Sequence, residues 1–229
     1  MKKILVTGGG GRFAKELKKI NSKYDFIFRN KKQLNILSTT SIKKNIKYFK
    51  AKTVLHLASL SRPMSIHDKD IKKSIDLNII GTANLVKICE KYRLKIIFFS
   101  TSYVYPGTKG NYKEKDPLLP WNNYGWSKLG AESSVQMYKN SLIIRACMTE
   151  KPFLHKYAFS NVKSNFIFHE DFVKIFLKII NKKGVVNIGG KSQTIYNFAR
   201  KYNKNVKKKL SNGELPKKMD MNLKKIKKF

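Results

Sequence analysis

KKILVTGGGGRFAKELKKI, residues 2–20, is the stretch that decides the fold of this chain. Its first part, residues 2–7, is a short β-branched run that ends in glycines, which predicts a buried strand entering a tight turn. In its second part Phe13, Leu17 and Ile20 share one face of a helix. The stretch therefore predicts a strand, a glycine turn and a helix in direct succession.

The glycines have the spacing of a dinucleotide-binding loop. Gly9-x-Gly11-x-x-Ala14 fits the pattern G-x-G-x-x-G/A, and Gly8-x-x-Gly11-x-x-Ala14 fits its close variant. Glycines let the backbone approach a pyrophosphate, and the helix N-terminus stabilises the negative charge. Since the loop stands between a strand and a helix, we expect it to bind a nicotinamide dinucleotide; a plain glycine turn is the alternative.

The end of the second predicted strand, residues 24–30, bears on the choice of cofactor. An acidic side chain there would bind the ribose 2′-hydroxyl of NAD, whereas a guanidinium suits the 2′-phosphate of NADP. This chain has Arg29-Asn30-Lys31-Lys32 and no acid. We therefore expect NADP, with NAD as the alternative if these are ordinary surface cations.

Strand and helix patterns alternate along the rest of the chain. Further strands are predicted at 52–59, 94–102, 140–147 and 184–190, and helices at 39–49, 68–92, around 123–136, 170–180 and 194–202. This alternation predicts an α/β fold, a Rossmann-like doubly wound parallel sheet. We expect an NAD(P)-binding domain at 1–150, a reduced C-terminal substrate-binding part at 151–203 and a loosely packed basic tail at 204–229.

Composition narrows the class of protein. The 229 residues are 41% hydrophobic, which suits one core, and the formal net charge is +35. Nearly all of that charge is lysine spread along the chain, so nucleic-acid binding is the less favoured interpretation. Cys89 and Cys147 lie in apolar segments, and no stretch resembles a leader or a membrane span, which favours a cytoplasmic protein. The four histidines lack metal-ligand spacing, so no metal is expected.

The stretch NNYGWSKLGAE, residues 122–132, places Lys128 one helical turn after Tyr124. Reduction of a carbonyl by hydride needs a proton donor at the carbonyl oxygen, and a nearby lysine would lower the pKa of a tyrosine for that task. Ser100-Thr101-Ser102 ends a predicted strand, at the sheet edge where ligands bind in parallel sheets. We therefore expect the glycine loop, Thr101, Tyr124 and Lys128 to meet there; an unrelated pair on a solvated helix face is the alternative.

With these motifs in place, residues 1–200 resemble the extended short-chain dehydrogenase/reductases of the nucleotide-sugar branch, and among them most of all the dTDP-4-dehydrorhamnose reductases. VTGGGGRFAKEL, VLHLAS, DLNIIGTANL, FFSTSYVYPGTKG, YKEKDPLLPWNNYGWSK and SLIIRA follow the order and spacing of that branch. The resemblance implies catalytic roles for Thr101 as hydroxyl donor, Tyr124 as proton donor and Lys128 as its activator. It also implies that Asn78 lies near the proton path.

Two sets of candidate binding residues complete the expected site. The cofactor set is Gly8, Gly10, Gly11, Arg12, Phe13, Arg29, Asn30, Leu57, Ala58, Ser59, Asn78, Ser100, Tyr124 and Lys128. The substrate set is Arg62, Thr101, Ser102, Tyr103 and Trp121.

The expected function is NADPH-dependent reduction of the keto group of a nucleotide-linked 4-keto-6-deoxy sugar. Ser102 stands where the resembling enzymes usually have an acid, and the segment 148–167 is shorter than theirs, so the cofactor half is better matched than the substrate half. An epimerase that retains NAD, and a non-catalytic cofactor-bound binding protein, remain the alternatives. A homodimer is left open.

Overall fold

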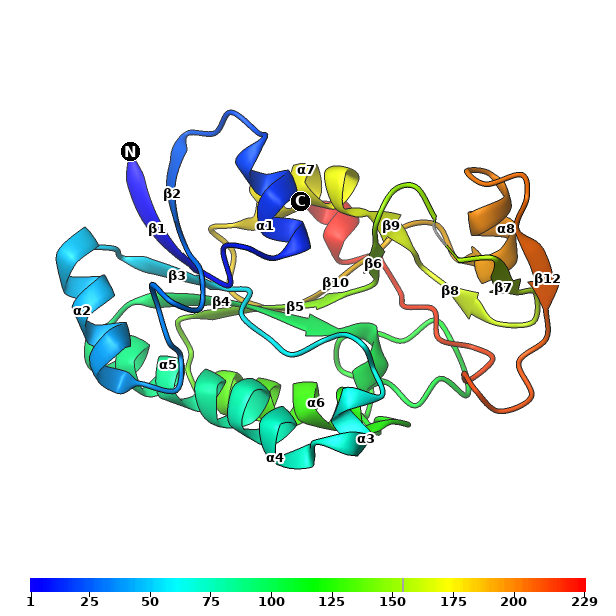
Figure 1. Ribbon diagram of the computed structural model, residues 1–229. Coiled ribbons are helices and arrows are strands. Elements are labelled where there is room, and N and C mark those ends of the chain that lie inside the picture. The colour runs from blue at the N-terminus through cyan, green and yellow to red at the C-terminus, as the bar shows by residue number, and fades with distance from the viewer. Residues whose placement is uncertain (154) are drawn as a thin grey trace.

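The computed structural model describes residues 1–153 and 155–229 and is built around one parallel sheet (Figure 1). Its six strands are β1 (Lys2–Thr7), β2 (Tyr24–Arg29), β3 (Thr53–His56), β4 (Lys95–Thr101), β5 (Ser141–Ala146) and β10 (Gly184–Ile188). They lie in the order β10-β5-β4-β3-β1-β2, and every neighbouring pair is parallel. The connections run outward in both directions from β1 and β3, so the predicted doubly wound sheet is confirmed, and the switch point where such folds bind ligands lies between these two strands.

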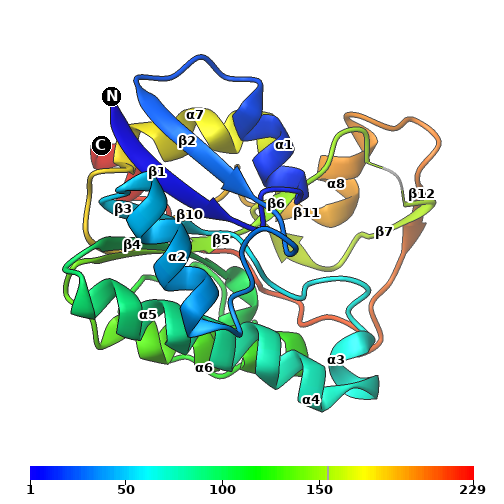
Figure 2. The ribbon, with the colours of Figure 1, turned by 60° about the vertical axis from the view of Figure 1, so that its left-hand side comes forward.

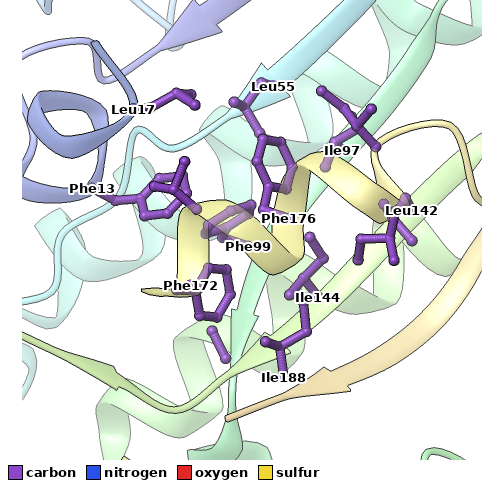
Figure 3. Close-up of a cluster of buried hydrophobic side chains, with 14 of the residues drawn as sticks. Phe13, Leu17, Leu55, Ile97, Phe99, Leu142, Ile144, Phe172, Phe176 and Ile188 are labelled. Carbon is purple, nitrogen blue, oxygen red and sulfur yellow. The ribbon is translucent and has the colours of Figure 1, made fainter. Parts of the chain in front are cut away.

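Helices cover both faces of the sheet (Figures 1 and 2). One face carries α1 (Arg12–Lys18) and α7 (His169–Ile179), and the other carries α2 (Thr39–Phe49), α5 (Gly81–Lys91) and α6 (Asn123–Gln136). Figure 3 shows the core under α7, where the ring of Phe13 lies 4.8 Å from that of Phe99 and 5.5 Å from that of Phe172, measured between centroids. Helix α1 ends before Ile20, which is exposed, so that residue does not extend the apolar face as predicted.

The single long helix predicted at 68–92 is wrong, because the segment consists of four consecutive elements. They are α3 (Ile66–Lys69), α4 (Ile71–Ser74), the π-helix η1 (Ile75–Ile80) and α5. Asp70 has non-helical backbone angles, and its side chain accepts a hydrogen bond from the Lys73 N–H, so it interrupts the helix by acting as an N-cap. The π-helix has a wider turn than an α-helix, a feature common at functional sites, and it contains Asn78.

The remaining short elements form a small lobe beyond the carboxyl ends of the strands (Figure 1). They are β6 (Met148–Thr149), β7 (Tyr157–Phe159), β8 (Lys163–Ser164), β9 (Ile167–Phe168), β11 (Gln193–Thr194), α8 (Ile195–Arg200), β12 (Lys207–Lys209) and the 3-10 turn η2 (Ser102–Val104), whereas the 3-10 turn η3 (Ile226–Lys228) packs beside β10, outside this lobe. This lobe has its own buried cluster, which includes Val162, Phe168 and Phe198. It faces the sheet edge where the site was expected, although the division of the chain into domains stays a prediction.

The C-terminal stretch 204–229 is packed against the rest of the protein. Strand β12 pairs with β7, Met219 and Met221 are buried, and the Asn222 N–H donates to the Tyr112 carbonyl at 2.8 Å. The expectation of a loosely packed tail is therefore wrong, because two methionines within a lysine-rich run supply enough apolar surface to bury. Among the described residues, no helix is both long and apolar enough to cross a membrane.

Candidate active site

The glycine loop is held tightly between strands β2 and β3. Gly8 has φ of +67°, and a Cβ there would lie 2.6 Å from the backbone nitrogen of Ala58. A Cβ on Gly9 would lie 2.8 Å from the backbone nitrogen of Arg29. Only glycine fits these two positions, and Gly11 then serves as the N-cap of α1. The loop thus directs the N-terminus of α1 toward the carboxyl edge of the sheet.

A hollow of about 310 Å³ lies beside this loop. It is lined by Gly8, Gly10, Gly11, Asn30, Lys31, Leu34, Asn35, Ile36, Leu57, Ala58, Ser59 and Leu77. A Cβ on Gly10 would meet no atom within 4 Å, so the backbone at Gly10 is open to an approaching group. Open glycine backbone, a helix N-terminus and an apolar floor together fit a dinucleotide. Seven of the residues predicted to bind the cofactor are brought together here: Gly8, Gly10, Gly11, Asn30, Leu57, Ala58 and Ser59.

Arg29 ends β2 as predicted, but its side chain is partly engaged by α2. Its Nε donates to the Asn45 Oδ1 at 3.0 Å, and its guanidinium lies 4.7 Å from the centroid of the Phe49 ring. Asn45 is itself fixed, because its amide nitrogen donates to the Gln33 and Ser41 carbonyls. These contacts hold the guanidinium in one orientation, with Nη1 and Nη2 as its remaining donors.

Tyr124, near the start of α6, lies against the end of β4. The Asn122 side chain caps the helix by accepting from the Gly125 N–H at 2.8 Å, which fixes the turn that carries Tyr124. Burial raises the pKa of the Tyr124 hydroxyl, while the Thr101 hydroxyl and the charges of Arg62 and Arg12 act in the opposite direction. Thr101 and Tyr124 are therefore together as predicted. The predicted lowering of the tyrosine pKa is wrong for the ligand-free protein, because burial outweighs the nearby cations.

Lys128 is buried one turn further along α6, with 4% of its surface exposed. Its Nζ lies 4.2 Å from the centroid of the Phe98 ring. Burial lowers the pKa of Lys128 to about 7, and Glu132 opposes that shift only in part. Because burial removes water from the Lys128 ammonium, an anionic or hydroxyl partner close to Nζ would stabilise its charged form. Lys128 thus lies where predicted, with a proton that is easily exchanged near neutral pH.

This burial predicts a pH-dependent stability effect. We expect Lys128→Met to raise the free energy of unfolding by about 1–3 kcal/mol at pH 6.5, because the wild type must bury a charge there. In the unfolded chain a lysine titrates near pH 10.4, so the penalty falls as pH rises from about 7 toward that value. Urea unfolding at pH 6.5 and pH 9 measures this, with exposed Lys139→Met as control. An equal gain at both pH values would show that Lys128 is not buried as a charge.

Asn78 occupies the space between the loop after β3 and helix α6. Its Oδ1 accepts from the Leu60 N–H at 2.7 Å, and its Nδ2 donates to the Leu60 carbonyl at 2.9 Å and to the Ser127 Oγ at 2.8 Å. The Ser59 hydroxyl also donates to Oδ1. Because these four bonds use the whole capacity of the amide, Asn78 positions its neighbours and its side chain is not the cofactor contact predicted for it.

Arg12 and Arg62 meet across the opening of the site. The Nη1 of Arg12 and the Nη1 of Arg62 both pair with the Oε1 of Glu150, the second at 3.4 Å. The three residues come from the first position of α1, the loop after β3 and the segment after β6. They bracket the approach to Tyr124, whose pKa both arginines lower after the larger effect of burial. This places Arg12 and Arg62 together at the predicted site, both paired with the Glu150 carboxylate.

The remaining predicted residues divide into three groups. Tyr103 and Trp121 are at the site, with ring centroids 5.3 Å apart and Tyr103 5.8 Å from Tyr124. Phe13 and Ser100 have side chains that serve elsewhere, in the core under α7 and in a 2.5 Å hydrogen bond to Glu132. Their prediction as cofactor contacts does not hold for the side chains. Ser102 lies near the Cys147 thiol, whose pKa it lowers against the larger, raising effect of burial.

Two residues of this region were not predicted. His67 lies 5.2 Å from Tyr124 between ring centroids, and Glu150 pairs with both arginines. The sequence carried no usable signal for either, since a single histidine and a single glutamate in irregular segments are common. Among the described residues, no three His, Cys, Asp or Glu side chains are grouped to hold a metal ion.

Comparison with known proteins adds three findings. The family described as RmlD substrate binding domain matches residues 1–151. A dTDP-4-dehydrorhamnose reductase of Aggregatibacter actinomycetemcomitans is 27% identical over 154 residues, which is 65% of this chain and 52% of that protein. The spore coat polysaccharide biosynthesis protein SpsK of Bacillus subtilis is 33% identical over 150 residues, 63% of this chain and 52% of that protein. The chain thus spans about half the length of the curated relatives it matches.

A solved structure shares the whole fold. The dTDP-4-dehydrorhamnose reductase of Bacillus anthracis, in complex with NADP, superimposes with a TM-score of 0.89 over 99% of this chain and 92% of that one, at 20% identity. The likeness therefore includes the small C-terminal lobe as well as the sheet.

Proposed function

Because the chain belongs to the RmlD substrate binding domain family, we propose that it reduces the keto group of a nucleotide-linked 4-keto-6-deoxy sugar with NADPH. One observation carries this proposal: the open glycine loop, Thr101, Tyr124 and Lys128 lie together at the carboxyl edge of the sheet. Two relatives named as dTDP-4-dehydrorhamnose reductases, one of them in complex with NADP, support the substrate and cofactor classes.

The mechanism follows from the chemistry of the three side chains. Bound NADPH supplies the hydride to the keto carbon. Thr101 holds the carbonyl oxygen beside the Tyr124 hydroxyl, and Tyr124 donates its proton to that oxygen as negative charge develops there. Lys128, with its pKa lowered to about 7 by burial, gains a proton when the tyrosinate forms nearby and so stabilises the phenolate. The hydroxyl product keeps the proton, and the tyrosine regains one from solvent.

The residues proposed to bind the substrate lie outside the hollow proposed to bind the cofactor. Tyr103 and Trp121 form an aromatic wall beside Tyr124, and Arg62 stands at the opening. An aromatic wall suits the apolar face of a sugar, and a guanidinium suits a diphosphate. We assign the substrate contacts to Arg62, Thr101, Tyr103 and Trp121 on this basis.

Cofactor preference is the first prediction of this function. We expect NADPH to bind about 10- to 100-fold more tightly than NADH, because a charge-assisted contact from the remaining donors of Arg29 to the 2′-phosphate contributes about 1.5–3 kcal/mol. Arg29→Ala should remove most of that preference and leave NADH binding nearly unchanged. Fluorescence titration of both cofactors at physiological ionic strength measures it, with Lys32→Ala as the control for screened surface charge. Equal affinities in the wild type would mean that Arg29 does not reach the ribose.

A turnover screen tests the function itself. Purified protein with NADPH is offered a panel of nucleotide-linked keto sugars, and NADPH oxidation is followed by the loss of the absorbance of the reduced nicotinamide. We expect oxidation with a 4-keto-6-deoxy sugar and none with the corresponding alcohols. Tightly bound, non-exchanging NAD and product isomers without net oxidation would favour the epimerase instead. Cofactor binding without turnover on any sugar would favour the non-catalytic, cofactor-bound binding protein.

The homodimer and the cytoplasmic location stay predictions.

A further inference from the structure

Two buried side-chain nitrogens stand out within the described parts of the chain, because neither has a hydrogen-bond partner. They are the Nε2 of His67 and the Nε1 of Trp121. Leaving a buried polar group without a partner is costly, so such atoms are rare and call for an explanation. The His67 ring lies next to that of the proposed proton donor Tyr124, and the Trp121 ring lies beyond Tyr103, which suggests that a ligand supplies the missing partners.

The two residues are the ends of one row of aromatic rings. His67 lies 5.2 Å from Tyr124, Tyr124 lies 5.8 Å from Tyr103, and Tyr103 lies 5.3 Å from Trp121, all between ring centroids. The row draws on α3, η2, the loop before α6 and α6 itself. Tyr124 is therefore flanked on one side by the His67 ring, whose Nε2 is unpaired. On its other side lies Tyr103, and beyond Tyr103 lies the Trp121 ring, whose Nε1 is unpaired.

His67 is fixed in place through its other nitrogen. Its Nδ1 lies 2.7 Å from the Ser74 hydroxyl, and the neighbouring Asp68 accepts from the Asn123 side chain at 2.8 Å, which ties α3 to α6. Only 1% of His67 is exposed. The facing charges are Asp68 and Lys128, and burial, the largest effect, lowers the pKa of His67. A neutral, oriented imidazole offers one nitrogen to a neutral oxygen of a ligand.

We propose that His67 is a specificity-determining residue that hydrogen-bonds, through Nε2, the substrate hydroxyl next to the keto group. This inference rests on the proposed function. In a 4-keto-6-deoxy sugar, the carbon on one side of the keto carbon bears the methyl group and the ring oxygen. The carbon on the other side bears the 3-hydroxyl, so this is the one hydroxyl adjacent to the oxygen that Tyr124 protonates. Because the His67 ring adjoins that of Tyr124, it lies beside the 3-hydroxyl when Tyr124 contacts the keto oxygen.

The test measures binding without turnover. Dissociation constants of a dTDP-linked 4-keto-6-deoxy sugar and of its 3-deoxy analogue are determined by calorimetry in the presence of NADP⁺, which carries no hydride to transfer. The wild type should bind the hydroxylated sugar about 10- to 100-fold more tightly. His67→Phe keeps a ring of similar size and should reduce that ratio to within about threefold, mainly by weakening the hydroxylated sugar. His67→Gln, which retains a polar group of similar reach, should restore part of it.

Control measurements separate a lost contact from a damaged fold. His155→Phe changes an exposed histidine outside the site and should keep the wild-type ratio, and thermal unfolding shows that each variant is folded. A ratio that stays at the wild-type value in folded His67→Phe would overturn the assignment of His67 alone. A wild type that binds neither sugar would overturn the proposed function and this inference with it. A wild type that binds both equally would overturn the inference and leave the function standing.

Discussion

Tyr124→Phe is expected to lower kcat for reduction of the sugar by about 10³-fold, the loss typical of removing a positioned general acid. The variant keeps the ring that packs between Tyr103 and His67, so binding should change little. KM should therefore stay within about threefold of the wild type, because the hydroxyl acts mainly in the transition state. Steady-state NADPH oxidation over a range of sugar concentrations measures both parameters.

Tyr48→Phe provides the matched control for this variant. Tyr48 is 76% exposed on helix α2 and contacts nothing at the site, so its loss of a hydroxyl should leave kcat unchanged. If Tyr124→Phe turned over at the wild-type rate, another group would have to deliver the proton and the proposed mechanism would fail.

The second large effect concerns the buried ion pair beneath the site. Arg145 and Glu132 are 2% and 0% exposed, and the Arg145 Nη2 lies 2.6 Å from the Glu132 Oε1. Arg145 also donates to the Tyr105 hydroxyl at 2.7 Å and to the Glu114 carbonyl at 2.9 Å. We expect Arg145→Met to lower the free energy of unfolding by about 3–5 kcal/mol, because it leaves the Glu132 carboxylate buried without its cation. Urea unfolding at pH 7 measures the loss.

A double variant identifies the cause of that loss. Arg145→Met combined with Glu132→Leu removes both charges and should recover a substantial part of the stability, since no uncompensated charge remains. Arg93→Met, at an exposed arginine, should stay within about 0.5 kcal/mol of the wild type. A double variant no more stable than Arg145→Met would show that lost hydrogen bonds to Tyr105 and Glu114, and not the buried charge, dominate.

Local sequence patterns correctly predicted those helices and turns whose conformation depends mainly on residues close to one another in the sequence. The helix predicted at 39–49 has those bounds in the structure, since its apolar spacing and polar start are both short-range signals. Its N-cap is Ser38, directly before the first residue of the predicted range. The glycine loop was predictable for the same reason. Only glycine allows both the turn of this loop and its close approach to the backbone at the ends of β2 and β3.

Features that depend on distant partners were out of reach of those patterns. The Arg29 side chain is directed by Asn45 and Phe49, and the pKa of Tyr124 is set mainly by burial, neither of which a sequence window contains. The break at Asp70 shows a polar capping residue overriding a helical pattern. Glu150 and His67 became candidates only when the fold brought them beside Arg12 and Tyr124.

The most direct test of the central claim follows the hydride itself. NADPH deuterated at C4 of the nicotinamide, on the transferred side, is incubated with the protein and a dTDP-linked 4-keto-6-deoxy sugar, and the product is examined by mass spectrometry and NMR. We expect one deuterium per product molecule, located on the sugar carbon that carried the keto group, with one NADPH consumed for each. A product without deuterium, or a sugar isomerised while NADPH is unchanged, would contradict the assignment of this protein as a reductase.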